Sequence, residues 1–144
     1  MIRVSSDAYN GKLLELGFNV DPPLDDELIC PSAEWLDQFG IYLFRRRPFY
    51  RTQSFDCDNF SAWAAVLATE SLLRADIKDA DHSIVRAYFR NNKPVHGIKD
   101  GNHSSNVVWL DDGRVVLFEP QNGKWSELAP LVADGSVTPY RVRW

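Results

Sequence analysis

Cys57 lies between two aspartates, Asp56 and Asp58, at the start of a helical pattern. Apolar residues recur there at three- and four-residue steps, which predicts a helix over about residues 60–74. Asp56 is suited to cap this helix, because a short acceptor satisfies free backbone N–H groups. The helix dipole then favours a Cys57 thiolate, whereas the flanking carboxylates oppose its ionisation. This conflict predicts a positive group nearby: a histidinium, a metal ion or both.

A β-hairpin of residues 106–110 and 114–118 gives the clearest strand signal in the chain. A two-residue turn would place His103 and Glu119 on opposite faces of this hairpin. A three-residue loop, with Gly113 in the left-handed conformation, would place them on one face. The loop sequence Asp-Asp-Gly favours the second arrangement. Both strands are apolar on both faces, which predicts a central position in a covered sheet.

A cysteine at a helix start, a histidine on one strand and a carboxylate on the next are the parts of a thiol nucleophile. Cys57 would attack a carbonyl, His103 would take or hold its proton, and Glu119 would fix the imidazole tautomer. This predicts a cysteine hydrolase that acts on a peptide or protein substrate. Two alternatives stay open: a buried structural cysteine, and a non-catalytic binding or inhibitor module, for example one encoded by a phage.

The order of the other elements predicts an α+β fold, in which one long helix in the N-terminal half carries the cysteine and packs on an antiparallel sheet. We expect a single domain of residues 1–144, with residues 1–30 as a poorly determined lead-in. Ser32 is predicted to begin a shorter helix that Gly40 ends. The other predicted strands are residues 41–44, 83–90 and 137–144, the last of them at a sheet edge.

Composition and charge exclude several classes of protein. A length of 144 residues with 44% hydrophobic content suits one domain with a core. The net charge of −4, without a long basic run, argues against nucleic acid as partner. No apolar stretch approaches ~18 residues and no leader pattern begins the chain, so we expect a cytoplasmic protein that does not enter a membrane.

Cys30 and Cys57 are expected to be free thiols, and His82 and His96 to be solvated.

Three motifs resemble the C-terminal domain of the Marasmius oreades agglutinin family of fungal lectins: Phe55 to Phe60, His103 to Asn106, and Phe118 to Gln121. That domain is a papain-like cysteine protease with a Cys/His/Glu triad, switched on by calcium or manganese. The resemblance covers roughly residues 30–125 and implies a papain-like fold, with Cys57 as nucleophile, His103 as general base and Glu119 as orienting acid. The chain lacks the family's sugar-binding β-trefoil and resembles stand-alone phage or bacterial relatives.

The resemblance also implies metal ligands and an oxyanion donor. It suggests Asp58 and Gln121 as ligands of Ca²⁺ or Mn²⁺. Independently of the resemblance, Asp56, Asp58 and Gln121 offer hard oxygen donors close to Cys57, the type that such cations take. The alternatives are helix capping for Asp56 and a strand-end amide bonded to backbone for Gln121. Papain-like enzymes place a glutamine before the cysteine, but Gln53 lies four positions before it rather than the usual six. Tyr50 or the backbone N–H of Cys57 are the alternative donors. The sequence predicts no oligomeric state.

Overall fold

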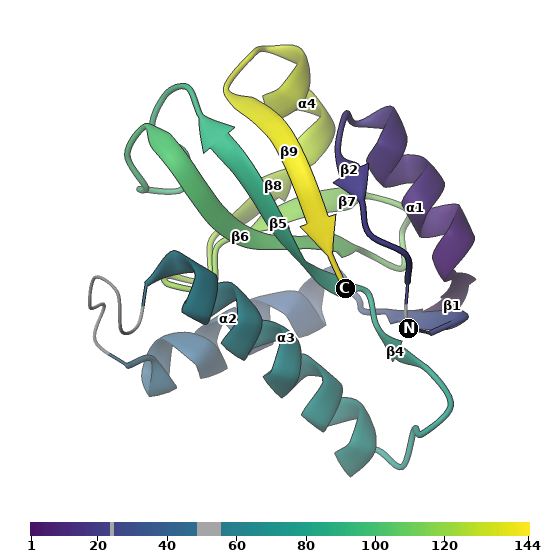
Figure 1. The fold of residues 1–144 in the computed structure, drawn as a ribbon. Coiled ribbons are helices and arrows are strands. Elements are labelled where there is room, and N and C mark those ends of the chain that lie inside the picture. The colour runs from purple at the N-terminus through teal and green to yellow at the C-terminus, as the bar shows by residue number, and fades with distance from the viewer. Residues whose placement is uncertain (24, 49–55) are drawn as a thin grey trace.

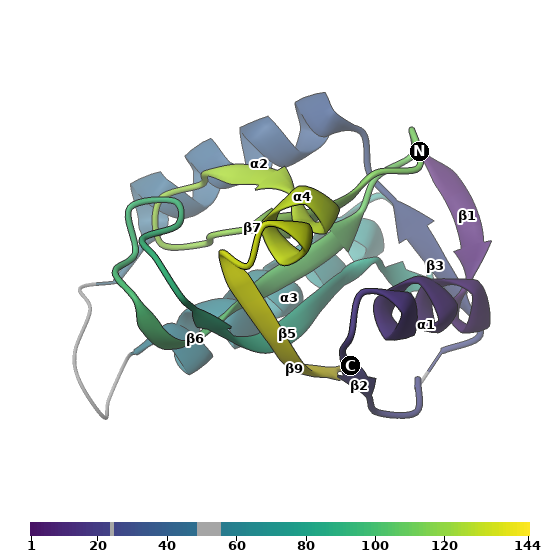
Figure 2. The ribbon, with the colours of Figure 1, turned by 90° about the horizontal axis from the view of Figure 1, so that it is seen from above.

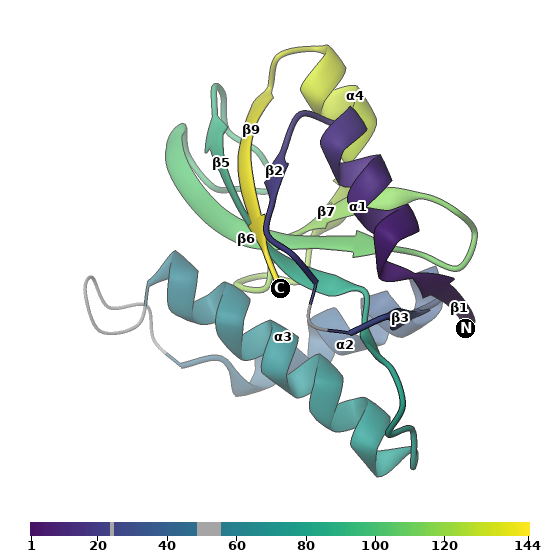
Figure 3. The same cartoon turned by 45° about the vertical axis from the view of Figure 1, so that its right-hand side comes forward.

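The centre of the molecule is a six-stranded sheet with helices on both faces (Figure 1). The computed structural model describes residues 1–23, 25–48 and 56–144. Helices α2 (Ala33–Arg46) and α3 (Cys57–Arg74) cover one face. Helices α1 (Ser6–Glu15) and α4 (Leu128–Ala133) lie on the other face, as Figure 3 shows.

The strands of the central sheet run in the order β2, β9, β5, β6, β7, β8. All neighbours are antiparallel except β2 and β9, which are parallel. A second sheet of three strands has the order β1, β3, β4, and its β3–β4 pair is parallel. Figure 2 shows β1 and β3 side by side, near α1. The bounds are β1 Ile2–Ser5, β2 Asn19–Val20, β3 Glu27–Cys30, β4 Asp81–His82, β5 Ile84–Asn91, β6 Gly101–Trp109, β7 Val115–Phe118, β8 Trp125–Glu127 and β9 Val137–Arg143.

Two apolar clusters form the core, one on each face of the central sheet. Tyr9 and Leu13 of α1 and Leu128 of α4 are fully buried against one face. Leu36 of α2 and Ala64 of α3 are fully buried against the other. Strands β5, β6 and β7 contribute to both clusters, which confirms that the hairpin lies in a covered part of the sheet.

The helix that carries the cysteine forms as the pattern predicts. Asp56 is its N-cap residue in extended conformation, and Cys57 is its first helical residue. The Asp56 backbone N–H donates to Asn59 Oδ1 at 3.3 Å, one half of a capping box that satisfies free groups at the helix start. The capping box thus fixes the backbone that carries the Cys57 thiol at the N-terminus of α3.

The hairpin also has the expected three-residue loop. Leu110 N donates to Arg114 O at 2.8 Å, and Gly113 has a φ of 92°. The ladder then pairs Asn106 with Phe118. Because the loop holds three residues, His103 and Glu119 face the same side, and the two-residue alternative is excluded.

The predicted fold class is wrong in its topology. We expected a papain-like α+β arrangement with one long helix on a single antiparallel sheet, whereas the structure has two sheets with parallel pairs and a second long helix. Residues 1–30 are not a lead-in, since they supply strands to both sheets. Residues 137–144 do not form an edge strand either, because β2 covers the outer side of β9. Among the described helices, none is long and apolar enough to cross a membrane.

Helix α2 differs from the prediction because Gly40 does not end it. The helix begins after Ser32, whose Oγ accepts from Trp35 N at 3.1 Å, and it continues through residues 41–44, which were predicted as a strand. A Cβ at Gly40 would lie 3.0 Å from the Cα and carbonyl oxygen of Gly123. The glycine therefore allows α2 to approach the turn after β7, and it has a packing role instead of a terminating one.

This contact gives a prediction with an internal control. Gly40→Ala should destabilise the protein by ~1–3 kcal/mol, because the added methyl overpacks against Gly123 backbone. Gly11→Ala should stabilise it by ~0.5–1 kcal/mol, since nothing lies within 4 Å of a Cβ at this helical position. Urea denaturation of both variants measures the difference. Equal effects of the two substitutions would contradict the close packing of α2.

Candidate functional site

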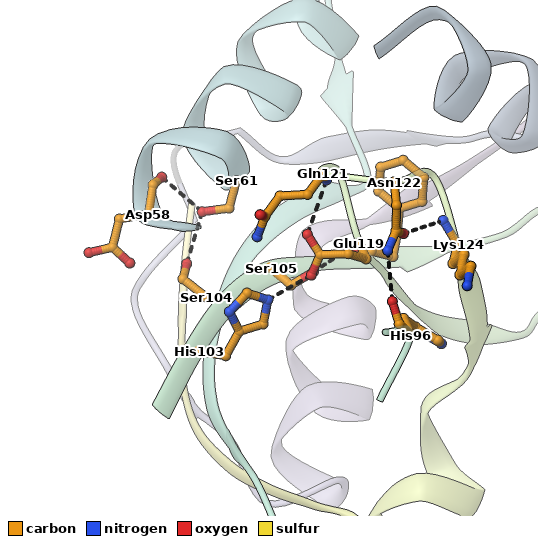
Figure 4. A network of polar contacts seen from close by, with 11 residues as sticks. Asp58, Ser61, His96, His103, Ser104, Ser105, Glu119, Gln121, Asn122 and Lys124 are labelled. Atoms are coloured by element: carbon orange, nitrogen blue, oxygen red, sulfur yellow. Dashed lines mark hydrogen bonds and ion pairs between the residues drawn. The ribbon is translucent and has the colours of Figure 1, made fainter. Parts of the chain in front are cut away.

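A buried histidine–carboxylate pair is the centre of the site. His103 on β6 and Glu119, just after β7, are joined by a bond of 2.6 Å between Nε2 and Oε2 (Figure 4). Their side chains are only 7% and 3% exposed. The Phe89 ring meets the imidazole edge-on, with ring centroids 5.6 Å apart. The hairpin register thus brings the predicted base and acid together, and burial protects their interaction from water.

The carboxylate of Glu119 is held by a tight turn. Its second oxygen, Oε1, accepts from the backbone N–H of Gln121 at 3.0 Å. The backbone of Glu119 accepts from Gly123 N and donates to Lys124 O, both at 2.8 Å. Asn122 Nδ2 donates to the carbonyl oxygen of His96 at 2.7 Å, which joins this turn to the loop after β5 (Figure 4). Glu119 therefore has one orientation, and that orientation fixes the imidazole.

Cys57 completes the group of three predicted residues. Burial opposes protonation of His103, but hydrogen bonds with Cys57 and with Glu119 raise its pKa to about 9. Because Nε2 is engaged by Glu119, Nδ1 is the nitrogen that remains for the thiol. The imidazole is therefore charged at neutral pH. It is the positive group that we expected near Cys57 to offset the carboxylates of Asp56 and Asp58. A thiol beside a histidinium is suited to react as a thiolate.

Sequence reasoning missed the residues that join the cysteine helix to the histidine strand. Ser61 Oγ and Ser104 Oγ lie 2.9 Å apart and are fully shielded from solvent, and Ser61 Oγ donates to Asp58 O at 3.0 Å. Asn106 Nδ2 donates to Ser61 O at 3.0 Å. Ser105 Oγ donates to Phe118 O within the hairpin. The available signal was the polar run from Ser104 to Asn106, which directly follows His103 and precedes the apolar end of the strand.

The predicted metal ligands are not brought together. The Asp58 carboxylate is exposed and points away from the Gln121 amide in Figure 4, and Asp56 caps α3. Within residues 1–23, 25–48 and 56–144, no three His, Cys, Asp or Glu side chains cluster as a metal site. These residue types do not include the Gln121 amide, so metal binding by Asp58 and Gln121 stays a prediction. Gln53 and Tyr50, the predicted oxyanion donors, lie outside the described residues.

The other histidines and the second cysteine have structural surroundings. His82 was expected to be solvated, but it is buried beside the Trp35 ring at 4.8 Å, and burial lowers its pKa to about 4. His96 Nε2 lies 2.7 Å from Ser126 Oγ. Cys30 and Cys57 are both free thiols, as predicted. Burial raises the pKa of Cys30 to about 11, so Cys30 is the unreactive thiol of the two.

Comparison with known proteins shows similarity of fold. No family model matches the chain, and no curated protein matches it. Two solved structures match 99% of the chain, each with a TM-score of 0.76. One is described as a complex of PSL1a with E64, at 14% identity. The other is Polyporus squamosus lectin bound to the human-type influenza-binding epitope Neu5Aca2-6Galb1-4GlcNAc, at 15% identity. The chain spans about half the length of these proteins, 51% and 49% respectively.

These neighbours correct the interpretation made from the motifs. One of them is described as a lectin, and its structure holds a sialylated glycan. This finding overturns the identification as a stand-alone papain-like cysteine protease domain and, with it, the function of a calcium- or manganese-dependent cysteine hydrolase. The peptide substrate that belonged to that function has no support from the neighbours. The physical reason is that Cys57, His103 and Glu119 define a local geometry, and one geometry on one fold can serve different functions.

The protonated imidazole predicts a pH dependence of stability. His103 has a raised pKa in the folded state, so its stabilising contribution is complete below the unfolded value of 6.5 and is lost as pH rises through about 9. The free energy of unfolding should fall across this window by up to about 1.4 kcal/mol per pH unit for one proton. Glu119→Gln removes the acceptor charge and should flatten this slope. Urea denaturation at several pH values measures it, and equal slopes in both proteins would contradict the assignment.

Proposed function

We propose that the chain binds ligands at a reactive thiol, Cys57, which His103 and Glu119 hold as an ion pair. The observation that carries this proposal is the buried 2.6 Å bond between His103 and Glu119. Cys57 lies close enough to the same imidazole to help raise its pKa. In this arrangement the thiol proton resides on His103 as part of the imidazolium, and the sulfur is a nucleophile toward electrophilic carbon. Glu119 stabilises the imidazolium that results. The neighbour described as an E64 complex supports a ligand at this fold.

Alkylation tests this site. Iodoacetamide should label Cys57 much faster than Cys30, because Cys30 is buried and burial raises the pKa of its thiol. The S–C bond forms, iodide leaves, and His103 retains the thiol proton. His103→Gln should slow labelling of Cys57 roughly tenfold or more, because the thiolate loses its counterion. His96→Gln is the matched control and should leave the rate unchanged. Mass spectrometry reads both cysteines in one sample.

The same assay examines two ligands. E64 is the ligand named with one structural neighbour, and we expect that incubation with E64 protects Cys57 from iodoacetamide. Runs in calcium and in chelator examine the predicted ligands Asp58 and Gln121, and equal rates would remove the metal from this site. The proposal fails if Cys57 and Cys30 react at equal rates, or if His103→Gln and His96→Gln behave alike.

Carbohydrate binding is the second candidate function. The observation that favours it is the fold similarity to a lectin whose structure holds a sialylated trisaccharide. That lectin is about twice as long as this chain, so the glycan ligand is a proposal for this chain rather than a property shared with the whole neighbour. Binding of a glycan would not require the thiol, which separates the two candidates experimentally.

Calorimetric titration with the trisaccharide Neu5Aca2-6Galb1-4GlcNAc measures this second function. Saturable binding at millimolar concentration is expected, with weaker binding of the same glycan without its sialic acid. Cys57→Ala should bind the trisaccharide as well as the natural chain does if the glycan lies elsewhere. Protection of Cys57 from iodoacetamide by the trisaccharide would instead place both ligands at one site. No saturable heat with either glycan would reject carbohydrate binding.

A further inference from the structure

A cavity lies between α3, β5 and the end of β9, where Figure 1 shows β9 running toward α3. Its volume is about 550 Å³, within the range of small-molecule sites. One wall is an apolar strip of α3 that includes Ala62, Ala65, Val66 and Leu73. Val66 is 66% exposed and Leu73 is 56% exposed, so the strip is uncovered. Cys57, His103 and Glu119 do not line this cavity.

Two arginines form the opposite wall. Arg86 of β5 and Arg143 of β9 are directly opposite each other in the strand ladder, and both line the cavity. Like charges in such cross-strand pairs destabilise a sheet. Arg143 Nε lies 3.9 Å from Asp21 Oδ2, but Asp21 is held more closely by Arg141, at 2.8 Å. Among the described residues, Arg86 has no acidic partner within ion-pair distance. Glu70 and Asp81 also line the cavity, so the arginines are matched in number by carboxylates there, but neither carboxylate forms an ion pair with Arg86 or Arg143.

The acidic residues of the cavity are already engaged. Glu70 accepts from Arg74 at 2.6 Å. Asp81 Oδ1 accepts from Thr69 Oγ1 at 2.6 Å and from the backbone N–H of His82 at 2.7 Å. The guanidinium groups are thus the charged groups of this cavity with donors left for a ligand, and they stand beside an apolar surface.

We propose that this cavity binds a small amphipathic carboxylate, such as a medium-chain fatty acid. The carboxylate lies between Arg86 and Arg143, whose planar forks match its two oxygens and whose mutual repulsion it relieves. The hydrocarbon chain lies along Ala62, Ala65 and Val66, where it buries apolar surface that is otherwise exposed. This site is separate from the thiol and does not depend on the function proposed for Cys57.

Three probes with the same chain length separate the contributions. Octanoate, octanol and octylamine are titrated into the full chain, and binding is followed by the fluorescence of tryptophan, since Trp144 lines the cavity. Octanoate should bind saturably and at least tenfold more tightly than octanol, with octylamine weakest. Equal affinities of octanoate and octanol would overturn the role of the arginines. No saturable response to octanoate would overturn the site itself.

Variants locate the ligand. Arg86→Gln should weaken octanoate binding at least tenfold, while the melting temperature without ligand stays equal or rises, because one of two repelling charges is gone. Arg90→Gln, at an exposed position of the same strand outside the cavity, is the matched control and should keep full affinity. Val66→Asp should abolish binding without unfolding the protein, since its side chain is exposed. Equal affinities of Arg86→Gln and Arg90→Gln would overturn the proposal. An unchanged iodoacetamide rate at Cys57 in Arg86→Gln shows that the two sites are independent.

Discussion

The register of one hairpin is the constraint on which the site depends. Side chains alternate between the faces of a strand, so a slip of one residue between β6 and β7 would move Glu119 to the face opposite His103. Gly113 prevents this slip, because its positive φ closes a three-residue loop that a β-branched residue would resist. The buried bond between His103 and Glu119 is therefore set by a residue at the far end of the hairpin.

A second set of hydrogen bonds fixes the position of the thiol relative to His103 and Glu119. Ser61, one turn into α3, bonds Ser104, the neighbour of His103, and Asn106 bonds the backbone of Ser61. These are polar groups in a buried place, where an unpaired partner costs free energy. Hydrogen bonds thus join α3 to β6, and they would break if α3 slid or rotated against the strand. The apolar residues around them supply the packing force but would tolerate small shifts.

Local features were predictable from the sequence, and the long-range arrangement was not. Capping chemistry placed Cys57 at a helix start, and turn chemistry placed His103 beside Glu119, because both depend on residues close together in the chain. Gly40 was misread, since its role comes from Gly123, far away in sequence. The place of β9 inside the sheet depends on β2 in the same way. Motif spacing predicted the geometry of the site but not its function. The function depends on which ligands the surface around the site can bind, and the motifs do not encode that surface.

The pairing of β2 with β9 has a consequence for how the chain folds. Asn19 lies opposite Arg141, so two segments near opposite ends of the chain become neighbours in one sheet. Contacts of such long sequence separation are formed at a high entropic cost and slow the folding of a domain. The β5–β6–β7 meander, whose strands are joined by short connections, can assemble before that closure. During synthesis, the central sheet stays incomplete until β9 has left the ribosome, and the outer side of β5 is an open edge until then.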